Sequence, residues 1–157
     1  MVSIDTVGGL MQNENKRIET KQEVKTYLAK LKYAINNGAK IFFQANRKVD
    51  DDRDEKHTNS YTVATLFPDE DPVDALKNEL LSLSVEEYLC TVKDLQFPNR
   101  SEMRVFGRKY TSFEDVYIKI RVELIAETSY GSHMTFVMSF HFAEFPFGED
   151  DFPFKKN

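Results

Sequence analysis

The stretch "DVYIKIRVELI", residues 115–125, alternates between polar and apolar side chains from Asp115 to Leu124. Its even-numbered positions hold only valine, isoleucine and leucine, whereas positions 117 to 123 hold tyrosine, lysine, arginine and glutamate at the odd numbers. Such alternation is typical of a β-strand with one buried face and one solvated face. The stretch "MTFVMSFHF", residues 134–142, repeats the pattern with methionine and phenylalanine at its even positions. We therefore expect the two stretches to pair as a β-hairpin through "TSYGSH".

This hairpin would bring the polar side chains of the two stretches onto one face. Because a shift by one residue turns a strand over, only registers that keep both apolar sets together are acceptable. In one such register Lys119 faces His141 and Arg121 faces Ser139. In the register shifted by two residues, Tyr117 faces His141 and Lys119 faces Ser139. Either register predicts one polar patch, made of Tyr117, Lys119, Arg121, Ser139 and His141.

The stretch "EMRVFGRKY", residues 102–110, is expected to form the preceding strand of the same sheet. We expect it to bury Met103 and Val105 and to turn Arg104, Phe106 and Arg108 toward the polar patch. A face with several cations, aromatic rings and a histidine suits a phosphate backbone and a stacked base. A histidine that titrates near neutrality also suits proton transfer. A solvated face that merely alternates charges accounts for the same letters, so both interpretations stay open.

The N-terminal half predicts a helix followed by a short strand. Thr20 and Glu23 stand at capping-box spacing, apolar residues follow at helical intervals, and Gly38 is a natural stop. The stretch "KIFFQAN", residues 40–46, is interpreted as a strand. The charged loop that follows, residues 49–60, is expected to be solvated.

Two further helices are predicted before the hairpin. One covers "PVDALKNELLSL", residues 72–83, with Asp71 as its cap, and a shorter one covers "SVEEYLCTVKD", residues 84–94. The stretch 60–68 is ambiguous between a strand and the lead into a turn. This order predicts an α+β domain with N-terminal helices packed on one face of a mainly antiparallel, C-terminal β-meander sheet.

The length of 157 residues fits one domain, which we place at residues 20–146. A flexible lead-in at 1–19 and a loosely held acidic tail at 147–157 are expected to flank it. The chain has one cysteine, no Cys/His cluster at metal-ligand spacing, no apolar run long enough for a membrane and no signal-peptide pattern. We therefore expect a cytoplasmic protein without a metal, cofactor or membrane association.

The net charge of −5 argues against a simple nucleic-acid-binding protein. The acidic residues are clustered, however, at 50–55, 69–74 and 149–151. Between positions 93 and 121 the chain has seven lysines or arginines against four acidic residues. The sequence thus predicts a locally basic region, which includes most of the polar patch, inside an acidic protein.

Several short motifs occur in an order that resembles the MqsR family of type II toxins, whose fold is similar to that of RelE-type ribonucleases. They are "VKTYLAKLKYAINNGAKIFFQANRK", "ELLSLSVEEYLCTVKD", "RVFGRKY", "DVYIKIRVEL" and "MSFHFAE", and they extend over roughly residues 22 to 145. Each motif is short, so the resemblance depends on their joint order. It implies a RelE-like fold and metal-independent, sequence-selective cleavage of messenger RNA, held off by a partner antitoxin.

The resemblance also implies site residues. Tyr117 and Lys119 stand at the family's "YIK" and His141 at its "SFH", while Arg47 and Lys48 match the basic end of the first strand. In this chemistry the RNA 2′-hydroxyl attacks phosphorus and leaves a cyclic phosphate and a 5′-hydroxyl. We expect His141 to act as general acid or base, Lys119 to stabilise the phosphorane, and Tyr117 to position the RNA or assist the proton transfer.

Further residues are expected to contact the RNA. Tyr88 matches the aromatic position of the family's "D/E-Y" element. Arg104, Arg108 and Arg121, together with Ser139, are expected to contact phosphates. The element "GP-x-x-D" of other members is replaced here by "TVKDLQFPNRSE".

A second interpretation of the chain is a non-enzymatic protein of a phage or mobile element. Its acidic clusters would then bind the basic groove of a nucleic-acid-processing enzyme and inhibit it. A third, an antitoxin-like or housekeeping partner in a complex, has no residues that speak for or against it.

Overall fold

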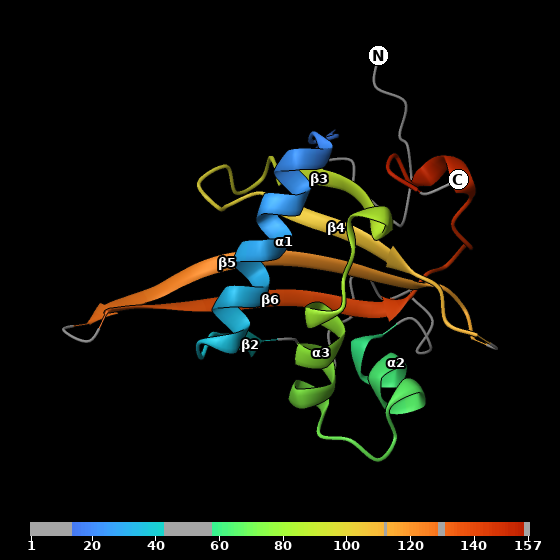
Figure 1. Ribbon diagram of the computed structural model, residues 1–157, viewed down its shortest axis with the longest axis horizontal. Helices are drawn as coiled ribbons and strands as arrows, with labels where there is room; N and C mark the ends of the chain where they lie inside the picture. Colours follow the sequence, from blue (N-terminus) through green and yellow to red (C-terminus); the bar gives the residue numbers. More distant parts are fainter. Residues whose placement is uncertain (1–13, 43–57, 112, 129–130, 156–157) are drawn as a thin grey trace.

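The computed structural model describes residues 14–42, 58–111, 113–128 and 131–155, with the backbone alone for residues 14, 123–128, 131–135 and 137. These residues confirm the predicted α+β class (Figure 1). One sheet has the strand order β1-β3-β4-β5-β6-β2, in which β2 is parallel to β6 and the other neighbours are antiparallel. The strands are β1 Glu14–Arg17, β2 Lys40–Phe42, β3 Tyr88–Asp94, β4 Met103–Arg108, β5 Val116–Thr128 and β6 Gly131–Phe142. The helices are α1 Lys21–Asn36, α2 Asn59–Leu66 and α3 Pro72–Leu81, with 3₁₀ turns η3 Val85–Glu87 and η4 Glu149–Asp151. Arg47 and Lys48 lie outside the described residues.

The central hairpin of β5 and β6 adopts the second of the two expected registers. Tyr117 pairs with His141 and Lys119 with Ser139. Where side chains are described, the even-numbered residues of the two strands pack in one cluster, with Val116, Ile118 and Ile120 buried in β5 and Phe136, Met138, Phe140 and Phe142 buried in β6. The alternation therefore predicted both the pairing and the face of every polar patch residue.

The two helices that were predicted to begin after the capping residues Thr20 and Asp71 are confirmed. Thr20 and Glu23 form a capping box at the start of α1, and Gly38 follows its end with φ +94°, a backbone angle that favours glycine. Asp71 caps α3 by accepting a hydrogen bond from the backbone N–H of Asp74. The apolar side chains of both helices form one core, the helix-side cluster, with the even-numbered residues of β5 and β6. Figure 1 shows α1 crossing the sheet over this hairpin.

The ambiguous stretch 60–68 forms helix α2, which lies against the free edge of β6. The backbone N–H of Phe140 donates to Asn59 Oδ1 at 3.0 Å, and that of Phe142 donates to Thr62 Oγ1 at 2.8 Å. In the described residues β2 pairs with 135–137, so these two N–H groups lie beyond the paired part of β6 and bond to α2 instead. Helix α2 therefore replaces the missing strand at this edge.

The prediction of a helix at 84–94 is wrong. The spacing of Ser84 and Glu87 marks only the turn η3, where Glu87 Oε1 accepts a hydrogen bond from the Ser84 backbone N–H at 3.0 Å. The chain then continues as β3, whose first five residues are all buried. A strand buried on both faces has no alternation that would distinguish it from a short buried helix.

The expected orientation of β4 is also wrong. Val105 pairs with Lys119 and Gly107 with Tyr117, so the odd-numbered residues of β4 share a face with the polar patch. Arg104 and Arg108 consequently lie on the opposite face, with Phe106 in the helix-side cluster. Val105 and Phe106 are adjacent, apolar and both buried, so alternation could not decide which of them faces the helices.

The described parts of the two flanking segments, residues 14–19 and 147–155, pack against the domain. Strand β1 pairs with β3 inside the predicted flexible lead-in, and Glu19 is 4% exposed. The expectation of a loosely held tail is wrong as well, because Phe147 and Phe152 are buried. Figure 1 shows the red C-terminal segment rising from the end of β6 past the ends of β5 and β4. Within the described ranges, no helix is both long and apolar enough to span a membrane.

Candidate functional site

The polar patch assembles on β5 and β6 as the sequence predicted. The rings of Tyr117 and His141 stack across the two strands, with their centroids 5.1 Å apart and their planes 25° from parallel. The next pair along the same face is Lys119 with Ser139, and Arg121 follows in β5. These last three side chains are partly exposed. The hairpin thus brings a phenol, an imidazole, an amine, a guanidinium and a hydroxyl onto one face.

Two members of the polar patch are not solvated, contrary to expectation. The exposed fractions are 2% for Tyr117 and 8% for His141. Tyr117 belongs to a second, smaller core, the tail-side cluster, to which the C-terminal segment contributes two phenylalanines. The members of the tail-side cluster are Leu89, Cys90, Val92, Val105, Tyr117, Ala143, Phe147 and Phe152. The part of this face around Tyr117 is therefore buried, although the sequence predicted that it is solvated.

Asp115 anchors the C-terminal segment to the start of β5. Its Oδ2 accepts hydrogen bonds from the Phe147 backbone N–H and from Lys109 Nζ, each at 2.9 Å. Its backbone oxygen accepts from the Ala143 N–H at 2.8 Å, and Lys109 Nζ also donates to the Phe147 oxygen at 3.1 Å. The segment is thus held at its beginning by one carboxylate and one ammonium.

Gly107 provides the space in which Phe147 lies. A Cβ at position 107 would come within 2.7 Å of the Phe147 ring, closer than carbon atoms normally approach. Because Gly107 pairs with Tyr117, the Phe147 ring lies over the strand position next to the stacked pair. The absence of a side chain at 107 therefore lets the segment approach the sheet closely.

The contact of His141 with a backbone carbonyl indicates which tautomer its ring adopts. Its Nδ1 lies 3.0 Å from the Phe142 backbone oxygen, which can only accept. Nδ1 therefore carries a proton in this contact, and in the neutral ring Nε2 is left as the basic nitrogen. A neutral imidazole with a basic Nε2 is the form required of a general base.

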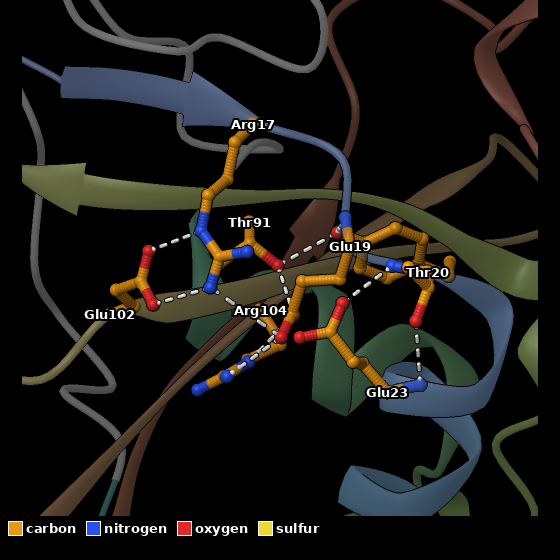
Figure 2. Close-up of polar contacts among 8 residues, drawn as sticks. Arg17, Glu19, Thr20, Glu23, Thr91, Glu102 and Arg104 are labelled. Carbon is orange, nitrogen blue, oxygen red and sulfur yellow. Dashed lines mark hydrogen bonds and ion pairs between the residues drawn. The ribbon is translucent and has the colours of Figure 1, made fainter.

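Arg104 does not belong to this face, because it forms a bidentate ion pair with the buried Glu19. Its Nε and Nη2 donate to the two Glu19 carboxylate oxygens, each at 3.0 Å. Thr91 also donates to this carboxylate, and the outer Arg17 is bonded to Glu102 (Figure 2). Arg104 thus links β4 to the segment between β1 and α1 on the helix side of the sheet, so the expectation that it lies beside the polar patch is wrong.

Tyr88 is part of the same buried network. Its hydroxyl accepts from the Glu19 backbone N–H at 3.0 Å and lies 2.7 Å from Thr91 Oγ1. The side chain is fully buried, and its ring packs edge-on against Phe106. In this conformation Tyr88 supports the junction between β1 and α1, and it presents no ring surface to RNA.

The charges around Glu19 set its ionisation. Burial alone would raise the pKa of its carboxyl group, but hydrogen bonds from Arg104 and Thr91 and the charges of Arg104 and Arg17 outweigh burial. The pKa of Glu19 is consequently lowered from its ordinary value of 4.5. The network is therefore a stable ion-paired core of the fold.

Arg108 is engaged in a second ion-pair cluster. Its Nε donates to Glu87 Oε2 at 2.7 Å, its Nη1 to Glu79 Oε1 at 3.2 Å, and its Nη2 to the Ser82 oxygen at 2.8 Å. The hydroxyl of Tyr110 also donates to Glu79, and burial raises the pKa of Tyr110. Arg108 thus connects β4 to the end of α3, on the face opposite the polar patch.

The acidic tail carried a signal that sequence reasoning missed. The tripeptide "FPF" occurs twice, at 145–147 and at 152–154, so the supposedly solvated tail is rich in large apolar rings. Phe147 and Phe152 enter the tail-side cluster, and Phe154 stacks on Tyr88 with ring centroids 5.8 Å apart. Aromatic density of this kind indicates a segment that packs on the domain.

The comparisons with known proteins leave the chain without an assigned family. No family model, no curated protein and no solved structure matches it. Among the described residues, no group of three or more histidines, cysteines, aspartates and glutamates is placed to hold a metal ion.

Proposed function

We propose that this protein is a metal-independent endoribonuclease toxin of the MqsR type, on a RelE-like fold with its helices on one face of the sheet. It would cleave messenger RNA in the cytoplasm and be neutralised by a partner antitoxin. One observation carries the proposal: the stacked Tyr117–His141 pair lies directly beside the Lys119–Ser139 pair on neighbouring strands. This places an acid/base group next to a cation, as cleavage by the 2′-hydroxyl requires.

The roles follow from the chemistry of each group. His141 Nε2 accepts the proton of the RNA 2′-hydroxyl while the 2′-oxygen forms a bond to phosphorus. The bond between phosphorus and the 5′-oxygen then breaks. The departing 5′-oxygen takes a proton from water. Lys119 neutralises the additional negative charge of the phosphorane, and Tyr117 holds the imidazole plane by stacking. The products are a cyclic phosphate and a 5′-hydroxyl.

Arg121 and Ser139 are proposed to position the RNA backbone. Both side chains are partly exposed and lie on the same face as Lys119, whose pairing partner is Ser139. A guanidinium and a hydroxyl are common donors to phosphate oxygens. Arg104 and Arg108 take no part, since their ion pairs lie on the other face.

Expression in a bacterial host tests the proposal. The wild-type chain should arrest growth, and His141→Ala should relieve the arrest, whereas His133→Ala should not, because the proposal does not use it. RNA incubated with purified protein and chelator should show 5′-hydroxyl and cyclic-phosphate ends. Harmless wild-type expression with intact RNA would contradict the proposal.

The non-enzymatic alternative is favoured by a different observation, the burial of Tyr117 and His141. In this alternative the two residues only fill the space under the C-terminal segment, and exposed acidic residues such as Glu149 and Asp150 bind a basic groove of a nucleic-acid-processing protein. Capture of such a protein by both the wild type and His141→Ala, without RNA cleavage by either, would support it.

A further inference from the structure

We propose that residues 143–155 form an autoinhibitory cover that competes with RNA for the tail-side face of the sheet. This inference rests on the proposed ribonuclease function. Phe147 lies on Gly107, the strand partner of Tyr117, and Phe152 belongs to the same tail-side cluster. The cover therefore occupies the position from which a base and its phosphate would approach Tyr117 and His141.

The cover can leave without unfolding the rest of the domain. It begins directly after Phe142, the last residue of β6, and takes part in no strand pairing. Its polar attachments to the domain include the bonds with Asp115 and Lys109, and its Phe147 and Phe152 rings join the tail-side cluster. The strand pairs and nearly all of the helix-side cluster do not depend on it, apart from the contact of Phe154 with Tyr88. Release of a segment that lies outside the strand pairs is local opening.

The cover and RNA exclude each other for two reasons. The first is steric, because the Phe147 ring fills the space over Gly107. The second is electrostatic, because the cover carries exposed carboxylates at Glu144 and Asp150, which repel phosphates, whereas Glu149 is paired with Lys155. The same carboxylates are therefore part of the mechanism that keeps RNA away in the closed state.

Competition between the cover and RNA would relate the apparent RNA affinity to the fraction of molecules in which the cover is open. If only the open state binds RNA, the apparent dissociation constant equals the intrinsic one divided by the open fraction. A substitution that loosens the cover must then raise the open fraction and the apparent RNA affinity by the same factor, as long as the closed state still predominates.

Cys90 reports the open fraction. It is the only cysteine of the chain, it is 1% exposed, and it lies in the tail-side cluster with Phe147 and Phe152. A buried thiol reacts with a disulfide reagent only when its surroundings open. The rate of its modification therefore measures how often the cover leaves.

The experiment compares two phenylalanines of the same segment, one buried and one exposed. Phe147 is 6% exposed and Phe145 is 72% exposed, so Phe147→Ser should loosen the cover and Phe145→Ser should not. In a His141→Ala background, which prevents cleavage, we measure thiol modification and the affinity for a labelled single-stranded RNA. Phe147→Ser should raise both by a common factor of about ten or more, and Phe145→Ser should change neither.

Asp115→Ala provides a second variant that keeps the test independent of the Phe147 side chain, and it should raise both quantities by a smaller common factor. Modification that is insensitive to low urea concentrations distinguishes local opening from global unfolding. Unchanged thiol reactivity in both variants would overturn the cover while leaving the ribonuclease proposal to its own test. Faster modification without any gain in RNA affinity would overturn the competition and count against the RNA site itself.

Discussion

Both faces of the β5–β6 hairpin have buried residues, but different parts of the molecule cover them. On one face Ile118 and Phe140 pack in a cluster to which α1, α2 and α3 all contribute. On the other face Tyr117 packs in a smaller cluster that is completed by the chain end. Three helices pack on the first face, whereas on the second face the cover adds the Phe147 and Phe152 rings and is bonded to Asp115 and Lys109. The difference indicates that one face supports the fold and the other can open for function.

A phenylalanine-to-alanine substitution on each side of the hairpin should show the largest difference between the two faces. Phe140→Ala should lower the free energy of unfolding by about 3–5 kcal/mol, because Phe140 is fully buried in the helix-side cluster. Phe147→Ala should cost less, because a weakened cover can open locally while the domain stays folded. Urea denaturation followed by circular dichroism measures the free energy of unfolding of both variants. Equal decreases would contradict the view that the helix-side cluster supports the fold and the cover opens locally.

The ion pairs of the two faces should differ as well. Glu19→Ala leaves the largely buried Arg104 without its carboxylate and should cost about 3 kcal/mol. Lys109→Ala removes the ammonium group that pairs with Asp115. Because the Lys109 side chain is 54% exposed, the loss should lower the free energy of unfolding by only about 0–1 kcal/mol. Thermal unfolding of both variants gives the comparison, and a larger loss for Lys109→Ala would reverse it.

A smaller, pH-dependent effect should separate the two faces further. Glu19 has a pKa below 4.5 in the folded protein, so its contribution to stability is present above about pH 4.5 and is lost as the pH falls through the folded value. Glu19→Gln should therefore start less stable near neutrality and lose less stability on acidification. A titration of the unfolding midpoint checks this, and parallel curves for wild type and variant would exclude Glu19 as a source of the acid sensitivity.

The sequence predicted the parts of the molecule in which one face alone is apolar. The pairing of β5 with β6, the starts of α1 and α3 and the end of α1 follow from alternation, capping residues and Gly38, whereas alternation left two registers of the hairpin open. Strand β3 and the orientation of β4 could not be predicted, because residues such as Val105 and Phe106 are apolar on both faces. In these segments the tertiary neighbours decide, and alternation gives no information.

The candidate site shows the same limit. The sequence brought Tyr117, Lys119 and His141 together correctly, because their positions depend only on the hairpin. It assigned Arg104 to the wrong face, because its partner Glu19 lies 85 residues away in the chain. The cover was missed because acidic residues separate its phenylalanines and give the tail a solvated composition.

Cleavage of a labelled single-stranded RNA by Phe147→Ser, measured in the presence of chelator with His141 intact or replaced by alanine, tests the central claim most directly. We expect the loosened chain with His141 to cleave about tenfold faster than wild type, and the His141→Ala chain to be slower by a factor of about 100 or more. Equal cleavage by the two loosened chains, or no cleavage by either, would contradict the account.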